Sequence, residues 1–263
     1  MSIIGKVDSL WRYPVKSMRG EELDEAFAGY PGVYGDRVFA FKSSASPLGF
    51  PYFTAREQRR LLQYRPRFRY PDKAACPVNL TDADKMGAGA LSADISELMV
   101  DVETPDGKTV AIDDPVLIEM LRGGMDEKHR LTLMRSHRAM TDCRPVSIFS
   151  LQTARQLAQE TETPIDKRRF RANVYLDLAS DNGFGEDELV GCSLKIGPKV
   201  IIRVLDRDRR CAMITLDPDT SVRTPAVLKT VAQAHEGMAG VYGVVIVEGM
   251  LRKGDSVELV ETT

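Results

Sequence analysis

The strand-like run Val200-Ile-Ile-Arg-Val-Leu205 leads directly into Asp206-Arg-Asp-Arg-Arg-Cys-Ala-Met-Ile-Thr-Leu-Asp-Pro-Asp-Thr220. The β-branched residues of the first run predict a strand, and Cys211 follows that strand closely. Positive charge beside a cysteine favours its thiolate, which is both a soft metal ligand and the reactive form that carries sulfur. The chemistry alone leaves open a second interpretation, a small buried cysteine that only packs. The nearby positive side chains are Arg207, Arg209 and Arg210.

Further runs of this kind predict strands in both halves of the chain. They are residues 3–11, 37–41, 131–135, 173–178 and 241–247. Residues 98–102 and 108–112 flank Pro105-Asp106-Gly107, whose turn chemistry predicts a hairpin. A barrel is the natural closure for so many strands. The predicted fold class is therefore mainly β with a few helices.

Helix signals are few. Asp114-Pro115 begins one pattern, which ends at Gly123-Gly124 and marks a boundary between two units. Ser150 is positioned to cap a second helix, and Thr224-Pro225 provides the cap and first-turn proline of a third. Residues 81–90 are polar, contain glycine and show no clear period, so a loop is predicted there. The predicted domains are 1–115, a β-barrel-like unit, and 116–263.

Composition excludes several classes of protein. Of the 263 residues, 43% are hydrophobic and 28% are charged, which is ordinary for a globular protein and argues against disorder. The net charge of −2 offers no global field for nucleic acid, so an anion must be bound by a local cluster. Neither a signal peptide nor a membrane span is recognisable, which predicts a cytoplasmic protein with no membrane partner.

Common catalytic and metal-binding motifs are also missing. The sequence holds no dinucleotide fingerprint, P-loop, nucleophile elbow or His-Glu-x-x-His motif. The four cysteines are too far apart for an iron-sulfur or zinc site and are expected to be free thiols. The dispersed histidines are expected to be structural or on the surface. These residues are Cys76, Cys143, Cys192 and Cys211, and His129, His137 and His235.

The segment 210–220 resembles the signature of the MOSC domain family, named after the C-terminal region of molybdenum cofactor sulfurases. Other matching stretches are Arg169-Phe-Arg-Ala-Asn-Val174, His235-Glu-Gly-Met-Ala-Gly-Val-Tyr-Gly243 and Gly254-Asp255. The first unit resembles the β-barrel domain that precedes MOSC in the amidoxime-reducing branch. Its matching stretches are Tyr13-Pro-Val-Lys-Ser17, Gly35-Asp36-Arg37 and Thr54-Ala-Arg-Glu57. The resemblance implies an N-terminal β-barrel domain followed by a MOSC β-barrel domain.

The same resemblance implies a molybdenum-molybdopterin cofactor with Cys211 as the metal ligand and catalytic residue. It implies that further residues line the cofactor or hold the pterin and its terminal phosphate: Lys16, Ser17, Arg56, Ser150, Arg171, Asn173, Arg210 and Tyr242. Guanidinium groups and ammonium groups suit a phosphate, and an asparagine amide can both donate to and accept from a pterin edge. Asp217 and Asp219 could in principle act as a general acid and base, but the sequence Asp-Pro-Asp-Thr favours their interpretation as turn residues.

Three functions agree with these features. The first is an oxidoreductase that reduces N-hydroxylated small molecules with electrons from an external carrier, a ferredoxin-like protein and its reductase. The second is a cofactor carrier or sulfur-relay module with a Cys211 persulfide. The cofactor sulfurases join MOSC to a pyridoxal-phosphate desulfurase domain, for which this chain is too short. The third is a pterin-binding protein without turnover.

Overall fold

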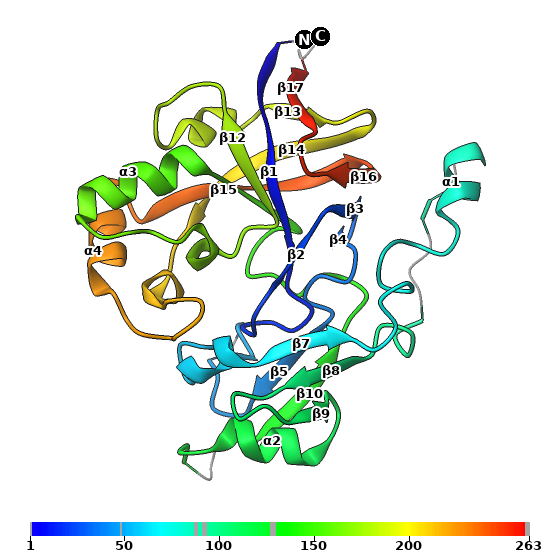
Figure 1. Ribbon diagram of the computed structural model, residues 1–263, viewed down its shortest axis with the longest axis vertical. Helices are drawn as coiled ribbons and strands as arrows, with labels where there is room; N and C mark the ends of the chain where they lie inside the picture. The colour runs from blue at the N-terminus through cyan, green and yellow to red at the C-terminus, as the bar shows by residue number, and fades with distance from the viewer. Residues whose placement is uncertain (1, 48, 87–88, 91–93, 127–129, 261–263) are drawn as a thin grey trace.

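A closed barrel of seven strands forms the largest part of the computed structural model, which describes residues 2–47, 49–86, 89–90, 94–126 and 130–260 (Figure 1). In hydrogen-bonded order its strands are β12 (Val174–Leu178), β11 (Val146–Ser150), β15 (Met238–Val247), β14 (Val200–Arg209), β13 (Ser193–Ile196), β17 (Ser256–Val260) and β1 (Ile3–Arg12). Strand β1 pairs in turn with β12, so the barrel is closed, and β11 and β12 form its parallel pair. Buried aliphatic side chains such as Ile148, Val204 and Val241 fill the interior. The prediction of a mainly β barrel is confirmed.

The two predicted units exchange strands. Strand β1 comes from the first unit, yet it lies in the barrel between β17 and β12, where the Trp11 amide donates to the Asn173 carbonyl at 2.8 Å. In the other direction, β10 (Leu131–Arg135) pairs with β5 (Phe39–Ser43) of the first unit. The units 1–115 and 116–263 are therefore interlocked.

Three small sheets complete the molecule. The first sheet is β10-β5-β6, in which β6 is Tyr52–Phe53. The second joins β16 (Gly249–Arg252), β3 (Glu25–Gly29) and β4 (Gly32–Val33), and the third joins β7 (Arg65–Phe68), β8 (Val100–Glu103) and β9 (Thr109–Ala111). A further strand, β2 (Glu21–Leu23), extends the barrel sheet beside β1. The predicted hairpin is confirmed as β8 and β9. A second hydrophobic core, which includes Phe39, Phe53 and Leu117, lies under the β10-β5-β6 and β7-β8-β9 sheets and is separate from the barrel interior. The β16-β3-β4 sheet adds Ala28 and Leu251 to the barrel core.

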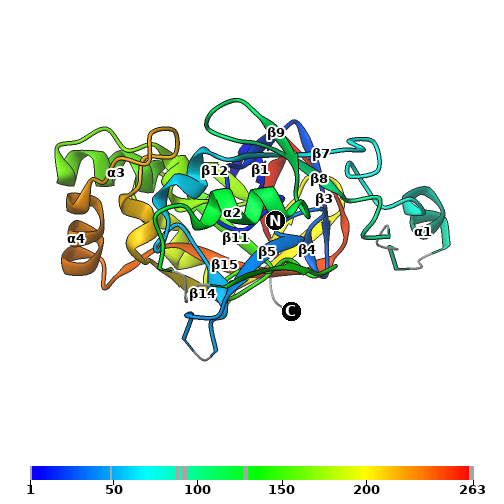
Figure 2. The same ribbon diagram turned by 90° about the horizontal axis from the view of Figure 1, so that it is seen from below.

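The helices follow the predicted signals with two exceptions. The described residues form α1 (Leu80–Met86), α2 (Pro115–Arg122), α3 (Leu151–Thr161) and α4 (Pro225–Ala234), with 3-10 turns η1 (Arg59–Gln63), η2 (Lys167–Phe170), η3 (Gly185–Leu189) and η4 (Ala212–Thr215). Asp114 caps α2 and Ser150 caps α3 as predicted. Thr224 occupies the N-cap position of α4, but its side chain makes no capping bond. Figure 2 shows α3 and α4 together on one side of the molecule and α1 on the other.

The predicted loop at residues 81–90 is wrong for its first part, which is the helix α1; residues 87 and 88 lie outside the described residues. Leu80 and the buried Ala83 are three residues apart, which places them on one helical face. Asp82 in the first turn and Lys85 in the last turn complement the helix dipole. These short-range features outweigh the polar composition on which the loop prediction depended.

Candidate functional site

A cavity of about 700 Å³, part of it open to solvent, lies where the two units meet. The loop after β1, the turn before η1, the segment before β11, the turn η2 and the end of β14 all contribute to its wall. The lining residues that also stand among the predicted site residues are Lys16, Ser17, Arg56, Arg171, Arg210, Cys211 and Tyr242. Seven of the nine predicted side chains therefore meet at one cavity.

Cys211 is placed at this wall by the end of strand β14. The strand stops at Arg209, and Cys211 takes the extended N-cap position of η4, with its carbonyl accepting from the Ile214 amide at 3.2 Å. The thiol is a free, partly exposed cysteine. Arg207 was expected to support a thiolate, but it turns away to pair with Asp187 at 2.8 Å and Glu236 at 2.6 Å. Of the three arginines at the end of β14, Arg209 and Arg210 line the cavity together with Cys211.

The cavity is strongly positive. Seven lining side chains are basic, namely Lys16, Arg37, Arg56, Arg169, Arg171, Arg209 and Arg210, and two are acidic, namely Asp142 and Asp208. Low-dielectric walls strengthen the field of such a cluster and favour an anion. Phe170, Met213 and Ile214 add an apolar part to the wall. The arrangement suits a ligand with an anionic end and a flat or apolar body.

Arg171 carries the clearest sign of a missing partner. It follows η2 in the left-handed conformation (φ 52°), and its guanidinium lies over the Tyr13 ring with Cζ 4.2 Å from the ring centre. Its Nη2 is buried and has no hydrogen-bond partner among the described residues. Burial lowers the pKa of Arg171 to about 10, so the group stays charged at neutral pH. A buried, charged donor without a partner is costly unless a ligand accepts from it.

Lys16 is anchored by the segment before β11. Its Nζ donates to the Met140 carbonyl at 2.7 Å, pairs with Asp142 and lies 4.4 Å from the Tyr52 ring centre. Burial lowers the pKa of Lys16, although Asp142 acts in the opposite direction. Asp142 is half-exposed at the cavity. This pair joins residues that are 126 positions apart and so fixes the loop after β1 against the segment before β11.

Arg210, Asp208 and Tyr242 form a buried group beside Cys211. The Arg210 Nε donates to the Ala239 carbonyl at 2.6 Å, and its Nη1 donates to the Phe170 carbonyl at 2.8 Å. Its Nη2 lies 2.8 Å from Asp208 Oδ2 without hydrogen-bond alignment. Burial raises the pKa of Asp208 to about 6, against the opposing effects of Arg210 and Tyr242. Asp208 can therefore hold or release a proton near neutral pH.

Two predicted site residues lie away from the cavity surface. The Asn173 Oδ1 accepts from the Ser147 amide at 3.2 Å, and its Nδ2 donates to the Trp11 carbonyl at 3.3 Å, so it ties β12 to β11 and β1. Ser147, rather than Asn173, lines the cavity. Ser150 is fully buried and donates through Oγ to Glu186, and therefore it works as part of the α3 N-terminus.

The remaining cysteines and histidines offer no further site. All four cysteines are free, as predicted. His235 pairs with Glu160 at 2.7 Å and stacks on Phe184, and His129 lies outside the described residues. Within the described part of the chain, no cluster of three or more His, Cys, Asp or Glu could hold a metal ion. A metal at this cavity would therefore depend on Cys211 and on ligands brought by its own cofactor.

Comparison with protein families matches this architecture directly. The model described as MOSC domain matches residues 135–258, and the model described as MOSC N-terminal beta barrel domain matches residues 4–87. The chain carries a MOSC domain behind a MOSC N-terminal barrel. MOSC domains are generally associated with binding of the molybdenum cofactor. No curated protein matches the chain.

Several solved structures are similar to this MOSC chain at low sequence identity. The YuaD protein from Bacillus subtilis is 14% identical, with 99% of this chain and 98% of that chain covered and a TM-score of 0.50. YiiM from Geobacillus stearothermophilus is 20% identical over 45% of this chain and 55% of that chain, with a TM-score of 0.36. YiiM from Escherichia coli is 18% identical over 46% of this chain and 56% of that chain, with a TM-score of 0.34.

Among the described residues, no helix has the length and apolar character needed to cross a membrane.

Sequence reasoning missed several residues at the MOSC cavity. Arg37 donates to the Arg171 carbonyl at 2.9 Å and pairs with Asp36, and its only signal was the Gly35-Asp36-Arg37 stretch. Asp142 and Asp208 gave no signal in the sequence. Asp142 pairs with a residue 126 positions away, and Asp208 stands among other charged residues at the end of a strand.

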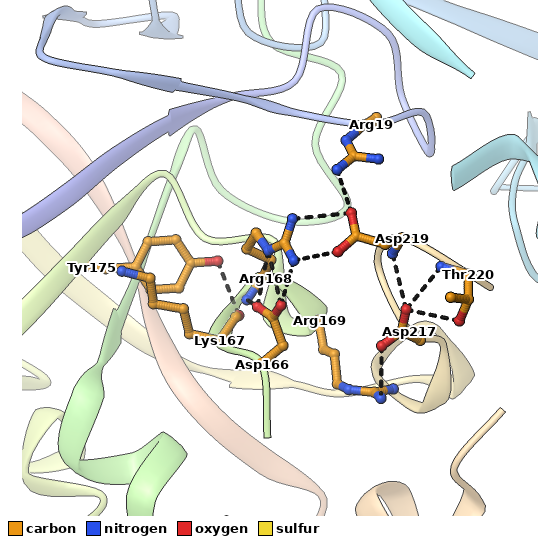
Figure 3. A network of polar contacts seen from close by, with 9 residues as sticks. All are labelled: Arg19, Asp166, Lys167, Arg168, Arg169, Tyr175, Asp217, Asp219 and Thr220. Carbon is orange, nitrogen blue, oxygen red and sulfur yellow. Dashed lines mark hydrogen bonds and ion pairs between the residues drawn. The ribbon is translucent and has the colours of Figure 1, made fainter. Parts of the chain in front are cut away.

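A network of ion pairs and hydrogen bonds joins segments that flank the cavity (Figure 3). Arg168 binds both Asp166 and Asp219 at 2.6 Å, and Arg19 of the first unit also pairs with Asp219. Asp217 accepts from the backbone amides of Asp219 and Thr220 at 3.1 and 2.8 Å, which confirms the interpretation as a turn. The network links the segments that carry Ser17, Arg171 and Cys211.

Proposed function

We propose that the chain is an oxidoreductase that binds the molybdenum-molybdopterin cofactor and reduces N-hydroxylated small molecules with electrons from an external carrier. The observation that carries this proposal is the position of Cys211 in a strongly positive cavity in which Arg171 Nη2 has no partner. A soft thiolate and an anion-binding wall are the two donor types that such a cofactor requires.

In this proposal the residues divide by chemistry. Cys211 binds the metal, and Lys16, Arg56 and Arg171 hold the terminal phosphate through charge-assisted hydrogen bonds. Ser17 and Tyr242 line the pterin with their hydroxyl groups. Arg210 positions Cys211, because its guanidinium is fixed to the Ala239 and Phe170 carbonyls. Asn173 supports the site through Ser147, and Ser150 has no direct role.

When bound, the cofactor supplies two-electron redox chemistry. Reduction of an N-hydroxyl group breaks the N–O bond and consumes two electrons and two protons, with release of an amine and water. Asp208 is the lining carboxyl that can hold a proton near neutral pH. The electrons come from outside, since the sequence has neither a dinucleotide fingerprint nor an iron-sulfur spacing of cysteines.

The test is direct. The protein is produced in a host that makes the cofactor, and molybdenum and pterin are measured in the fresh preparation. Reduction of an amidoxime is then followed by chromatography with reduced viologen, and separately with reduced nicotinamide alone. We expect stoichiometric metal and activity with viologen only. Activity with nicotinamide alone contradicts the external carrier, and bound cofactor without any turnover favours cofactor carriage instead.

A further inference from the structure

Six exposed arginines form a basic band beside the cavity. The band is defined as Arg56, Arg59, Arg60, Arg65, Arg67 and Arg69, and Glu57 is the single acidic residue in the same stretch of sequence. Arg59 and Arg60 lie on η1, and the next three lie on or next to β7, where alternate residues point to the same face. The whole chain has a net charge of −2, so this positive charge is a local feature.

Two arginines of the band, Arg59 and Arg60, have no ion-pair partner among the described residues. Arg65 pairs with Glu103 at 3.7 Å and Arg69 pairs with Asp101 at 2.6 Å, both across the β7–β8 ladder. Arg67 lies directly opposite Asp101 in the same ladder. The side chains of Arg59 and Arg60 are both exposed. Two neighbouring exposed cations without an ion-pair partner add little to the stability of the monomer, and they leave positive surface that can attract an anionic partner.

The band begins at the mouth of the cavity. Arg56 lines the cavity and lies over the Phe50 ring, with Cζ 4.6 Å from its centre. The Cα of Arg59 is at most about 11 Å farther along the chain. On the other side of η1, Gln63 Nε2 donates to the Thr220 carbonyl at 3.0 Å, which fixes η1 against the turn that follows η4. The band thus begins at a residue that lines the same cavity as Cys211, and η1 is fixed to the segment that follows Cys211.

We infer that this basic band is the docking surface for an acidic one-electron carrier protein. The inference rests on the proposed function, which requires electrons from outside. Charge complementarity would steer the carrier to the rim nearest the metal ligand and orient it there. Of the large hydrophobic side chains in residues 56–70, Tyr70 is the exposed one. A membrane anchor and a stacking platform for single-stranded nucleic acid both need more exposed apolar or aromatic surface than this.

The experiment compares the cofactor-loaded wild type with Arg59→Glu/Arg60→Glu. Each protein reduces an amidoxime with an acidic ferredoxin and its reductase, and separately with reduced viologen. We expect the ferredoxin-driven rate of the variant to fall about tenfold at low salt and to lose its salt dependence. The viologen-driven rate should be unchanged, because neither arginine lines the cavity. The matched control, Arg155→Glu/Lys229→Glu, inverts two exposed cations on α3 and α4 and should leave both rates unchanged.

The outcomes separate the two proposals. Absence of viologen-driven turnover in the wild type refutes the proposed function itself. The docking surface is overturned if the wild type turns over with viologen but the double variant has the same ferredoxin-driven rate as the wild type. A wild type that neither binds the ferredoxin at low salt nor accepts its electrons also overturns it. A third outcome also overturns the docking surface. In it, Arg59→Glu/Arg60→Glu abolishes binding to RNA or to vesicles containing phosphatidylserine, but ferredoxin still binds to the variant.

Discussion

The guanidinium of Arg171 stacks on the ring of Tyr13, with Cζ 4.2 Å from the ring centre, while its buried Nη2 has no hydrogen-bond partner among the described residues. Stacking positions the group but satisfies none of its donors. A residue held in this way is prepared for a ligand and contributes little to the fold. Arg210 differs from Arg171, because two of its nitrogens are bound to carbonyl groups and its Nη2 lies 2.8 Å from Asp208.

The first prediction follows from this contrast. Arg171→Ala should change the free energy of unfolding of the cofactor-free protein by less than about 1 kcal/mol, because loss of stacking and removal of an unsatisfied buried charge offset each other. Arg210→Ala should cost about 3 kcal/mol or more, since it frees two carbonyls and leaves Asp208 without its counter-charge. Urea unfolding measures both values. Equal destabilisation by the two variants contradicts the division of roles.

The second prediction concerns retention of the cofactor. Arg171→Ala removes a charge-assisted bond worth about 1.5 to 3 kcal/mol, so the affinity for the pterin phosphate should fall about 10- to 150-fold. Arg155→Ala is the control, because Arg155 is exposed on α3. Pterin extracted after gel filtration and oxidised to its fluorescent form measures the loss. Similar pterin content in the two variants removes Arg171 from the site.

The third prediction tests the metal ligand. Cys211→Ser should lose at least about 90% of its molybdenum, because a neutral hydroxyl is a far poorer ligand than a thiolate. Cys192→Ser is a matched control, since Cys192 is also a free and partly exposed cysteine but lies outside the cavity lining. Mass spectrometry of the metal content decides the matter, with circular dichroism to show that both variants fold. Full molybdenum in Cys211→Ser excludes the proposed ligand.

Local patterns were sufficient to predict eight of the seventeen strands and three of the helices. The β-branched run at Val241 and the Asp114-Pro115 start are short-range signals, and the structure has a strand and a helix there. The exchange of β1 and β10 could not be predicted in this way, because it depends on pairing between distant residues such as Leu10 and Val174.

The same limit applies to the site. The stretches that resemble MOSC proteins identified most of the cavity, including Cys211 and Arg171. They did not reveal that Asp142 neutralises Lys16, since those residues are 126 positions apart. Nor did they show that the Ser150 hydroxyl donates to Glu186. A helix cap and a cofactor contact would use the same hydroxyl and give the same sequence signal.

The fourth prediction concerns that hydroxyl. Ser150→Ala should cost about 2 kcal/mol of stability, because it removes the cap on the Thr153 amide and one of the donors to buried Glu186. Cofactor retention should stay at the wild-type level, since Ser150 does not line the cavity. Ser180→Ala, in an exposed turn, is the control and should change stability by less than about 0.5 kcal/mol. Loss of pterin from a folded Ser150→Ala protein would restore Ser150 to the site.

The last prediction uses the titration of Asp208. Burial raises the pKa of Asp208 to about 6 from the ordinary 3.8, so the folded protein binds more protons than the unfolded chain between these values. Stability therefore falls as the pH rises through that window, by about 3 kcal/mol in total relative to Asp208→Asn, which does not titrate. Urea unfolding of the cofactor-free proteins at pH 4 and pH 7 measures the difference. Asp219→Asn provides a control of opposite sign, because the hydrogen bond from Arg168 lowers the pKa of Asp219, and the wild type should lose stability relative to that variant as the pH falls. If the wild type and Asp208→Asn differ by the same free energy of unfolding at both pH values, the pKa of Asp208 is not raised by its burial.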